Sequence, residues 1–203
     1  APAKYGIFVV PPANEGWQQT TTIEGTKIID AWVKPNEPPF VSEIGPVFPH
    51  IFMGFVQPMD NIPAGGTADI TGQVVNIHLG APWDGFGFHE GGPFLYTTPW
   101  VGINDMALNQ GTAIYAAETV ENAQGEPGAF TIPNLPPGSY QLVVWDRNLD
   151  IIIDFQTLTV DPGGTTCNNG QSCDLGSVPV FAWFTHLDNW VFYDSNENGF
   201  PDA

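Results

Sequence analysis

The chain has 203 residues and a mass of 22.0 kDa, and its 42% hydrophobic content is enough for a packed core. Four Lys and Arg residues against 22 Asp and Glu residues give a formal net charge of −18. This charge excludes binding to a nucleic-acid backbone or to an anionic membrane surface. The 23 Gly and 20 Pro residues exclude long helices and are typical of short strands joined by turns.

Residues 1–64 are interrupted by prolines and contain short strand candidates at 6–10, 20–23, 27–33 and 51–56. This segment is predicted to be a small β module or an extended connector along a neighbouring module. No run in the chain approaches the roughly 18 apolar residues of a membrane-spanning helix, so no membrane span is expected.

Residues 65–162 show a more regular pattern. Strand candidates at 68–79, 100–107, 112–118, 129–132, 139–146 and 155–160 are each bounded by turn residues. Several short strands at this spacing predict an all-β fold, an antiparallel immunoglobulin-like sandwich with flanking β-rich modules.

The most specific motif runs from residue 128 to residue 144. One strand ends near Leu135, residues 136–138 form a turn, and alternation places Tyr140, Leu142 and Val144 on the core face of the next strand. The motif resembles the Cna-B-like modules of large bacterial surface proteins, which include SdrD-type B repeats and carboxypeptidase-regulatory-like domains. The residues that carry the resemblance are Phe130, Ile132, Leu135, Pro137, Gly138, Tyr140 and Leu142.

The resemblance implies one seven-stranded sandwich over about 68–160 and says nothing of a ligand. Many members of that family form an internal crosslink from a lysine, but residues 35–203 contain no lysine. The crosslink is therefore not expected within this module. Arg147, the one basic residue of that stretch, is expected to neutralise the neighbouring carboxylates of Asp146 and Asp150.

Cys167 and Cys173 lie in a loop rich in Gly and Asn, at 163–177. This setting favours a small disulfide over two free buried thiols, and two thiols are too few for a structural zinc site. A disulfide indicates an oxidising compartment, so the predicted location is extracellular or at the cell surface.

Residues 178–203 are predicted to start a further β module that ends in a calcium loop. Numbered from Asp194, the loop has oxygen ligands at the spacing of an EF-hand-like site, with a glycine at position 6. It resembles the loops that open SdrD-type repeats, which implies Ca²⁺ as the cofactor; the alternative is an ordinary Asn/Gly turn. The predicted ligands are Asp194, Asn196, Asn198, the Phe200 carbonyl and Asp202.

A long loop at 82–96 combines aromatic and polar residues. It is a candidate glycan or protein ligand site, or else it folds its aromatic side chains over one end of the sandwich. The candidate ligand residues are Trp83, Phe86, Phe88, His89 and Tyr96.

No nucleophile elbow, phosphate-binding glycine motif or distinctive carboxylate pair is present, so the chain is predicted not to be an enzyme. The predicted function is that of a structural segment of an exported multi-domain surface or filament-type protein, stiffened by calcium and adhesive. Its partners would be neighbouring modules of the same or identical chains. The alternative is a carbohydrate-binding module that uses the loop at 82–96, and a β-sandwich hydrolase ranks third.

Overall fold

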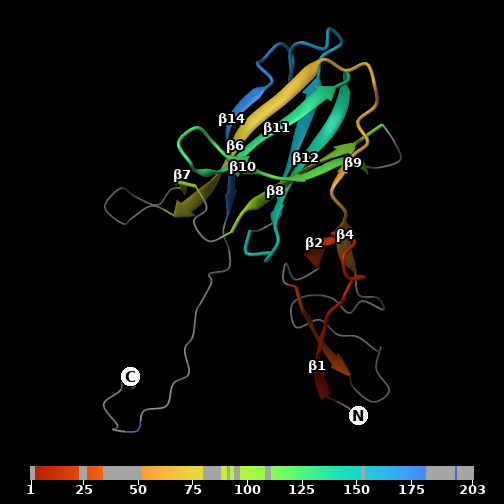
Figure 1. Ribbon diagram of the computed structural model, residues 1–203, viewed down its shortest axis with the longest axis vertical. Helices are drawn as coiled ribbons and strands as arrows, with labels where there is room; N and C mark the ends of the chain where they lie inside the picture. Colours follow the sequence, from red (N-terminus) through yellow and green to blue (C-terminus); the bar gives the residue numbers. More distant parts are fainter. Residues whose placement is uncertain are drawn as a thin grey trace.

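The computed structural model describes residues 3–22, 27–33, 52–79, 88–90, 92–93, 97–107, 111–151, 154–181 and 195. Every regular element among them is a strand, as predicted, and the centre of the fold is an immunoglobulin-like sandwich of two sheets (Figure 1). In the described part of the chain, no helix is long and apolar enough to cross a membrane.

The first sheet has the strand order β10–β11–β6–β14, and β7 also pairs with β6. These strands are β6 (Ala68–Leu79), β7 (Phe88–Glu90), β10 (Val120–Glu121), β11 (Pro127–Leu135) and β14 (Asp174–Phe181). All pairs are antiparallel except β14 with β6, which is parallel.

The second sheet has the order β13–β12–β8–β9–β5, and its pairs are all antiparallel. These strands are β5 (Met59–Asp60), β8 (Pro99–Asp105), β9 (Thr112–Glu118), β12 (Gly138–Asp146) and β13 (Asp154–Val160).

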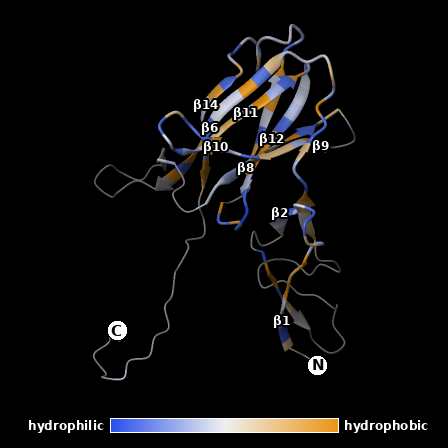
Figure 2. Ribbon diagram, viewed as in Figure 1, coloured by the Kyte–Doolittle hydropathy of each residue, from blue (hydrophilic) through white to orange (hydrophobic). Residues whose placement is uncertain are grey.

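The main core lies between the two sheets, where the hydrophobic positions of the strands meet (Figure 2). Tyr140, Leu142 and Val144 are buried in it, which confirms the predicted face of β12. The turn at 136–138 carries the chain from the first sheet to the second. The Tyr140 hydroxyl donates a 2.9 Å hydrogen bond to the Pro136 carbonyl and fixes this crossing.

Two boundaries differ from the sequence prediction. Residues 178–181 do not start a new module, because Val178 and Val180 belong to β14 and are buried in the sandwich core. The sandwich also begins before residue 65, since Met59 and Asp60 form β5 and pair with Ala116 and Tyr115 of β9. The pattern of a short apolar run indicates a strand but not the strand with which it pairs. The sequence alone therefore could not assign either segment to the sandwich.

The N-terminal segment forms two small β ribbons. The first pairs β1 (Ala3–Ile7) with β3 (Ile29–Val33), and the second pairs β2 (Gln18–Thr22) with β4 (Met53–Val56), both antiparallel. Ile29 and Ala31 are buried with Ile7 and Met53 packed against them, so the ribbons share a small core. The β2–β4 ribbon lies directly next to the sandwich, and the β1–β3 ribbon lies farther out (Figure 1).

Candidate ligand-binding groove

The outer face of the second sheet carries an apolar cluster of its own. Alternation along β12 directs Val143 and Trp145 away from the main core, yet both are buried, at 7% and 2% exposure. Trp100 of β8 and Ala116 of β9 join them. Met59 of β5, the edge strand of this sheet, packs against the cluster, and so does Val56 of β4. Through Val56 the β2–β4 ribbon covers part of a face that an isolated sandwich would expose to water.

The two indoles of the cluster are cross-strand neighbours, since Trp145 pairs with Trp100 in the β12–β8 register. Their ring centroids lie 6.0 Å apart with an interplanar angle of 32°. Both indole N–H groups are buried, and neither has a hydrogen-bond acceptor among the described residues. An unpaired buried donor costs about 1–3 kcal/mol, so the burial of the ring surfaces has to offset that cost.

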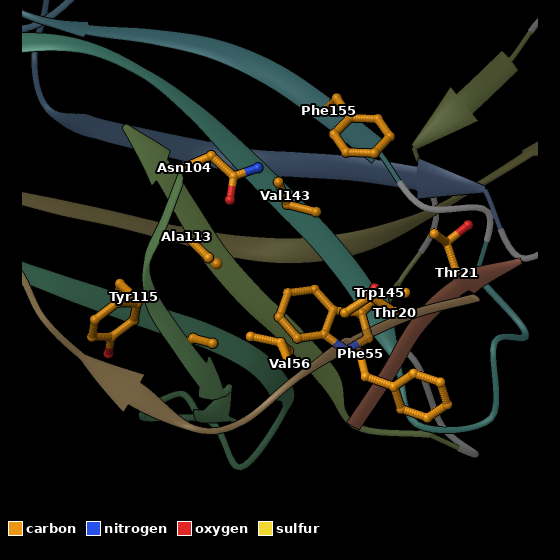
Figure 3. Close-up of a pocket in the computed structure, with 13 residues that line it drawn as sticks. Thr20, Thr21, Phe55, Val56, Asn104, Ala113, Tyr115, Val143, Trp145 and Phe155 are labelled. Atoms are coloured by element: carbon orange, nitrogen blue, oxygen red, sulfur yellow. The ribbon is translucent and has the colours of Figure 1, made fainter. Parts of the chain in front are cut away.

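A groove of about 240 Å³ lies between the β2–β4 ribbon and this face of the sheet (Figure 3). Aromatic and aliphatic side chains form most of its surface, and Thr20, Thr21 and Asn104 add polar groups. The lining residues are Thr20, Thr21, Gly54, Phe55, Val56, Gly102, Asn104, Ala113, Tyr115, Ala116, Val143, Trp145 and Phe155. Apolar walls with a few converging polar groups are the usual composition of a ligand site.

Gly102 shapes the floor of the groove. A Cβ at this position would lie 3.1 Å from Cζ3 of Trp145 and 3.1 Å from the carbonyl oxygen of Tyr115. Such contacts are tighter than most side chains tolerate, so the indole packs closely over β8 only because residue 102 is glycine.

Tyr115 and Phe155 supply aromatic surface at the groove. Phe155 is 52% exposed, so part of its ring is accessible from solvent at the groove. Burial raises the pKa of the Tyr115 phenol above its ordinary value, and the Asp60 carboxylate adds to the shift. The hydroxyl therefore stays protonated at neutral pH and donates a 3.4 Å hydrogen bond to the Thr131 carbonyl.

The predicted disulfide is present. The sulfur atoms of Cys167 and Cys173 lie 2.09 Å apart and their Cα atoms 5.1 Å apart. Asp161 organises the loop that the disulfide closes. Its carboxylate accepts hydrogen bonds from the Thr166 hydroxyl at 2.8 Å and from the Gly170 amide at 2.7 Å. These bonds, the Thr166 bond above all, lower the pKa of Asp161.

The structure leaves two predicted sites without a description. The calcium ligands Asp194, Asn196, Asn198, Phe200 and Asp202 lie outside the described residues. So do Trp83, Phe86 and Tyr96 of the aromatic loop. Phe88 and His89 have a described backbone, which forms β7 and pairs with Leu79 and His78 at the end of β6.

Sequence reasoning missed the groove at the β2–β4 ribbon. A signal was available in the sequence of β12. Val143 and Trp145 are apolar at positions where strand alternation predicts the outward, polar face. A strand that is apolar on both sides needs a cover on both sides. The sequence did not show that the cover comes from residues 53–59.

Comparison with known families gives one match. Residues 107–168 match the family model for polysaccharide lyase family 4, domain II, an fn3-like β-sandwich domain. The matched segment runs from the β8–β9 connection through β13 into the disulfide loop. No curated protein and no solved structure matches the chain.

The match supports a β-sandwich module and does not confirm the resemblance to Cna-B-like modules. It also corrects one prediction. The chain was expected not to be an enzyme, and this is contradicted because the matched domain belongs to a family of enzymes, in which it is an accessory domain. Accessory sandwiches carry no catalytic motif, so a search for such motifs could not detect the relationship.

Proposed function

We propose that this chain is an accessory segment of an exported multi-domain protein, in which it holds neighbouring modules in a fixed orientation. The observation that carries the proposal is the packing of Val56, on β4 of the ribbon, against the sandwich cluster that contains Trp100, Val143 and Trp145. This contact joins the N-terminal ribbons to the sandwich through apolar surface. A hydrophobic junction resists bending more than a polar linker does.

The location we propose is extracellular or at the cell surface, supported by the disulfide between Cys167 and Cys173. The partners would be neighbouring modules of the same or identical chains, in a surface or filament-type assembly with an adhesive role. The finer kinship with Cna-B-like modules is part of this proposal, and the crossing fixed by Tyr140 and Pro136 supports it.

Hydrogen exchange tests the junction. Val56→Asp places a charge against the Trp145 face, so the amides of β2 and β4 should lose protection while those of β6 and β11 keep it. Val10→Asp is the control, because it makes the same substitution at a side chain that is 77% exposed. Equal protection of β2 and β4 in the wild-type chain and Val56→Asp would rule out a docked ribbon.

Calcium binding at residues 194–202 belongs to the same proposal, in which the ion stiffens the connection to a following module. Its support is the ligand spacing in the sequence alone. The test is the melting temperature with Ca²⁺ and with chelator, on a chain that continues past Ala203 to position 12 of the loop. Asp194→Ala should abolish the calcium response and Glu121→Ala, an exposed acid on β10, should not. An equal response in both variants would contradict a site in this loop.

Carbohydrate binding is the second candidate function. The match to a domain of a polysaccharide lyase family and the aromatic groove of Figure 3 favour it. A glycan array with two variants separates the two candidate faces. Phe155→Ala tests the groove and Trp83→Ala tests the loop at 82–96, and loss of binding in one variant alone identifies the face. Binding that survives both changes would exclude both faces.

A further inference from the structure

Four strands end the two sheets of the sandwich: β10 and β14 in the first sheet, β13 and β5 in the second. An open strand edge is a template for another strand, and proteins block such edges with short strands, charges, prolines or irregular pairing. β10 and β5 have two residues each, one of them an acid, Glu121 or Asp60. β14 contains Pro179, and its register against β6 shifts between Asp174 and Ser177. These three edges therefore carry features that prevent further pairing.

The edge of β13 has none of these features after its first residue. The strand has seven residues, contains no proline, and pairs with β12 without a register shift. Residues 155–160 carry no charge. The disulfide loop covers the far half of this edge, because the Asn168 amide donates to the Thr159 carbonyl at 2.8 Å and the Asp161 amide to the Thr166 carbonyl at 2.9 Å. This cover ends at Thr159.

The near half of the edge is open at Phe155 and Thr157. The backbone groups of alternate residues in a strand point to the same side, and those of Thr159 point to the loop. The N–H and C=O groups of Phe155 and Thr157 therefore point away from β12 as well. Among the described residues, none bonds to these outward groups. Thr157 is exposed, and Phe155 is 52% exposed where it lines the groove of Figure 3.

We propose that this open half of β13 pairs with the same strand of a second copy of the chain, antiparallel about a two-fold axis at Gln156. The proposal rests on the function proposed above, in which identical chains are neighbours, and names the surface through which they meet. In this register Phe155 of each copy lies opposite Thr157 of the other. Each outward N–H then donates to an outward C=O across the axis, so one pairing satisfies all of these groups.

The side chains also suit this pairing. The two Phe155 rings become diagonal neighbours on one face of the joined sheets, at a separation that aromatic side chains can span. Each exposed ring is therefore covered by the other copy.

The charge of the chain favours a second copy over a basic partner at this edge. Like charges that lie opposite each other destabilise a strand pair, and a chain of net charge −18 repels its copies. The uncharged stretch at 155–160 lets two such chains approach. A basic partner gains no attraction from an uncharged edge. The interface is small, so the pairing is expected to be weak in solution and effective between chains that an assembly already holds close together.

Analytical ultracentrifugation of the full chain, at concentrations up to about 1 mM, tests the pairing. We expect a monomer–dimer equilibrium. Thr157→Asp places a carboxylate of each copy next to the axis and should weaken dimerisation by about tenfold or more. Thr131→Asp is the matched control, because it adds the same charge at an exposed threonine of β11, inside the first sheet, and should leave dimerisation unchanged.

Thr157→Pro removes an outward N–H that β12 does not use, so it should also weaken dimerisation while the sandwich stays folded. Circular dichroism of both variants at position 157 checks the fold. A chain that is monomeric at about 1 mM would overturn the proposal, and so would equal dimerisation of Thr157→Asp and Thr131→Asp.

Cysteine crosslinking tests the register. In the two-fold pair the Cα atoms of the two Gln156 residues lie about 4.5 Å apart, a separation that a disulfide can span. Gln156→Cys should therefore give a covalent dimer under mild oxidation. Gln124→Cys, at an exposed turn position, should stay monomeric. Equal crosslinking of the two variants would overturn the two-fold pairing.

Hydrogen exchange distinguishes the second copy from other occupants. The amides of Phe155 and Thr157 should gain protection as the protein concentration rises. Protection that is independent of concentration would show that a segment of the same chain covers the edge, and would overturn the proposal. A monomeric chain in which β2 and β4 stay protected would overturn the pairing alone and leave the docked ribbon standing. A dimer in which Val56→Asp leaves that protection unchanged would overturn the docked ribbon and leave the pairing standing.

Discussion

Trp145 of β12 lies beside Trp100 of β8 on the outer face of the second sheet, with ring centroids 6.0 Å apart. This pair makes the sandwich apolar on a face that faces water in many antiparallel sheets. The β2–β4 ribbon covers the pair, and the groove forms where the cover is incomplete. Trp145 therefore belongs both to the cluster against which the ribbon packs and to the lining of the candidate ligand site.

Replacing Trp145 by alanine should destabilise the chain by about 3–5 kcal/mol, as for other buried large aromatic residues. The loss should affect the ribbon as well, since the indole contributes to the surface on which Val56 packs. Urea unfolding measures the stability. Phe155→Ala is the control, because that side chain is 52% exposed and its removal should change stability by no more than about 0.5 kcal/mol. Equal effects of the two variants would show that the outer cluster does not support the fold.

Gly102→Ala should destabilise the protein by about 1–3 kcal/mol through overpacking. The added methyl group meets Trp145 and the Tyr115 carbonyl at 3.1 Å, and the carbonyl belongs to the paired strand β9 and has little freedom to move. Gly163→Ala is a matched control, because its nearest contact would be the Thr165 hydroxyl at 3.9 Å. Thermal melts of both variants make the comparison. An unchanged melting temperature for Gly102→Ala would mean that the indole shifts at no cost.

The sequence predicted the sandwich well because alternation of residue character is a local property. The strand expected at 112–118 is found there, and those expected at 139–146 and 155–160 are off by one residue at one end. The disulfide was predictable because its two cysteines lie in one loop. The groove was not predictable, since Val56 and Trp145 are 89 positions apart and nothing local links them. The pairing of β14 with β6 could not be predicted either, because the two strands are far apart in the sequence.

The expected ion pair of Arg147 shows the same limit. Sequence placed Arg147 next to Asp146 and therefore predicted a local ion pair. The backbone turn after β12 instead directs the Asp146 carboxylate inwards, to the amide of Ile151. Asp146 ends β12 and Arg147 begins the turn, so the two side chains are neighbours in the sequence without a shared environment.

Acidification should loosen the disulfide loop before the sandwich unfolds. The folded pKa of Asp161 is lowered by its hydrogen bonds, so its contribution to stability is present above the unfolded pKa and is lost as pH falls through the folded pKa. Asp161→Asn should remove this pH dependence, because a side-chain amide has no proton to gain or lose over this pH range. Its single carbonyl oxygen can accept the bonds from Thr166 and Gly170, which share Oδ2 of Asp161, but its nitrogen cannot accept the bond from the Asn169 amide. The Gly170 amide resonance, followed by NMR during an acid titration, reports the change. The same titration curve in the Asn variant would assign the transition to another group.

Reduction of the disulfide between Cys167 and Cys173 should lower the free energy of unfolding by about 2–3 kcal/mol, as the loop-entropy estimate gives for a short closed loop. The effect should stay moderate because Cys167 remains buried in the main core as a small apolar side chain, and the bonds of Asp161 still hold the loop. Urea unfolding with and without reductant measures the difference, and a Cys167→Ala, Cys173→Ala variant, which has no disulfide to reduce, controls for other effects of the reductant. Intact mass after alkylation establishes the starting state. Two alkylated thiols in the unreduced native protein would contradict the disulfide, and with it the main support for an extracellular location.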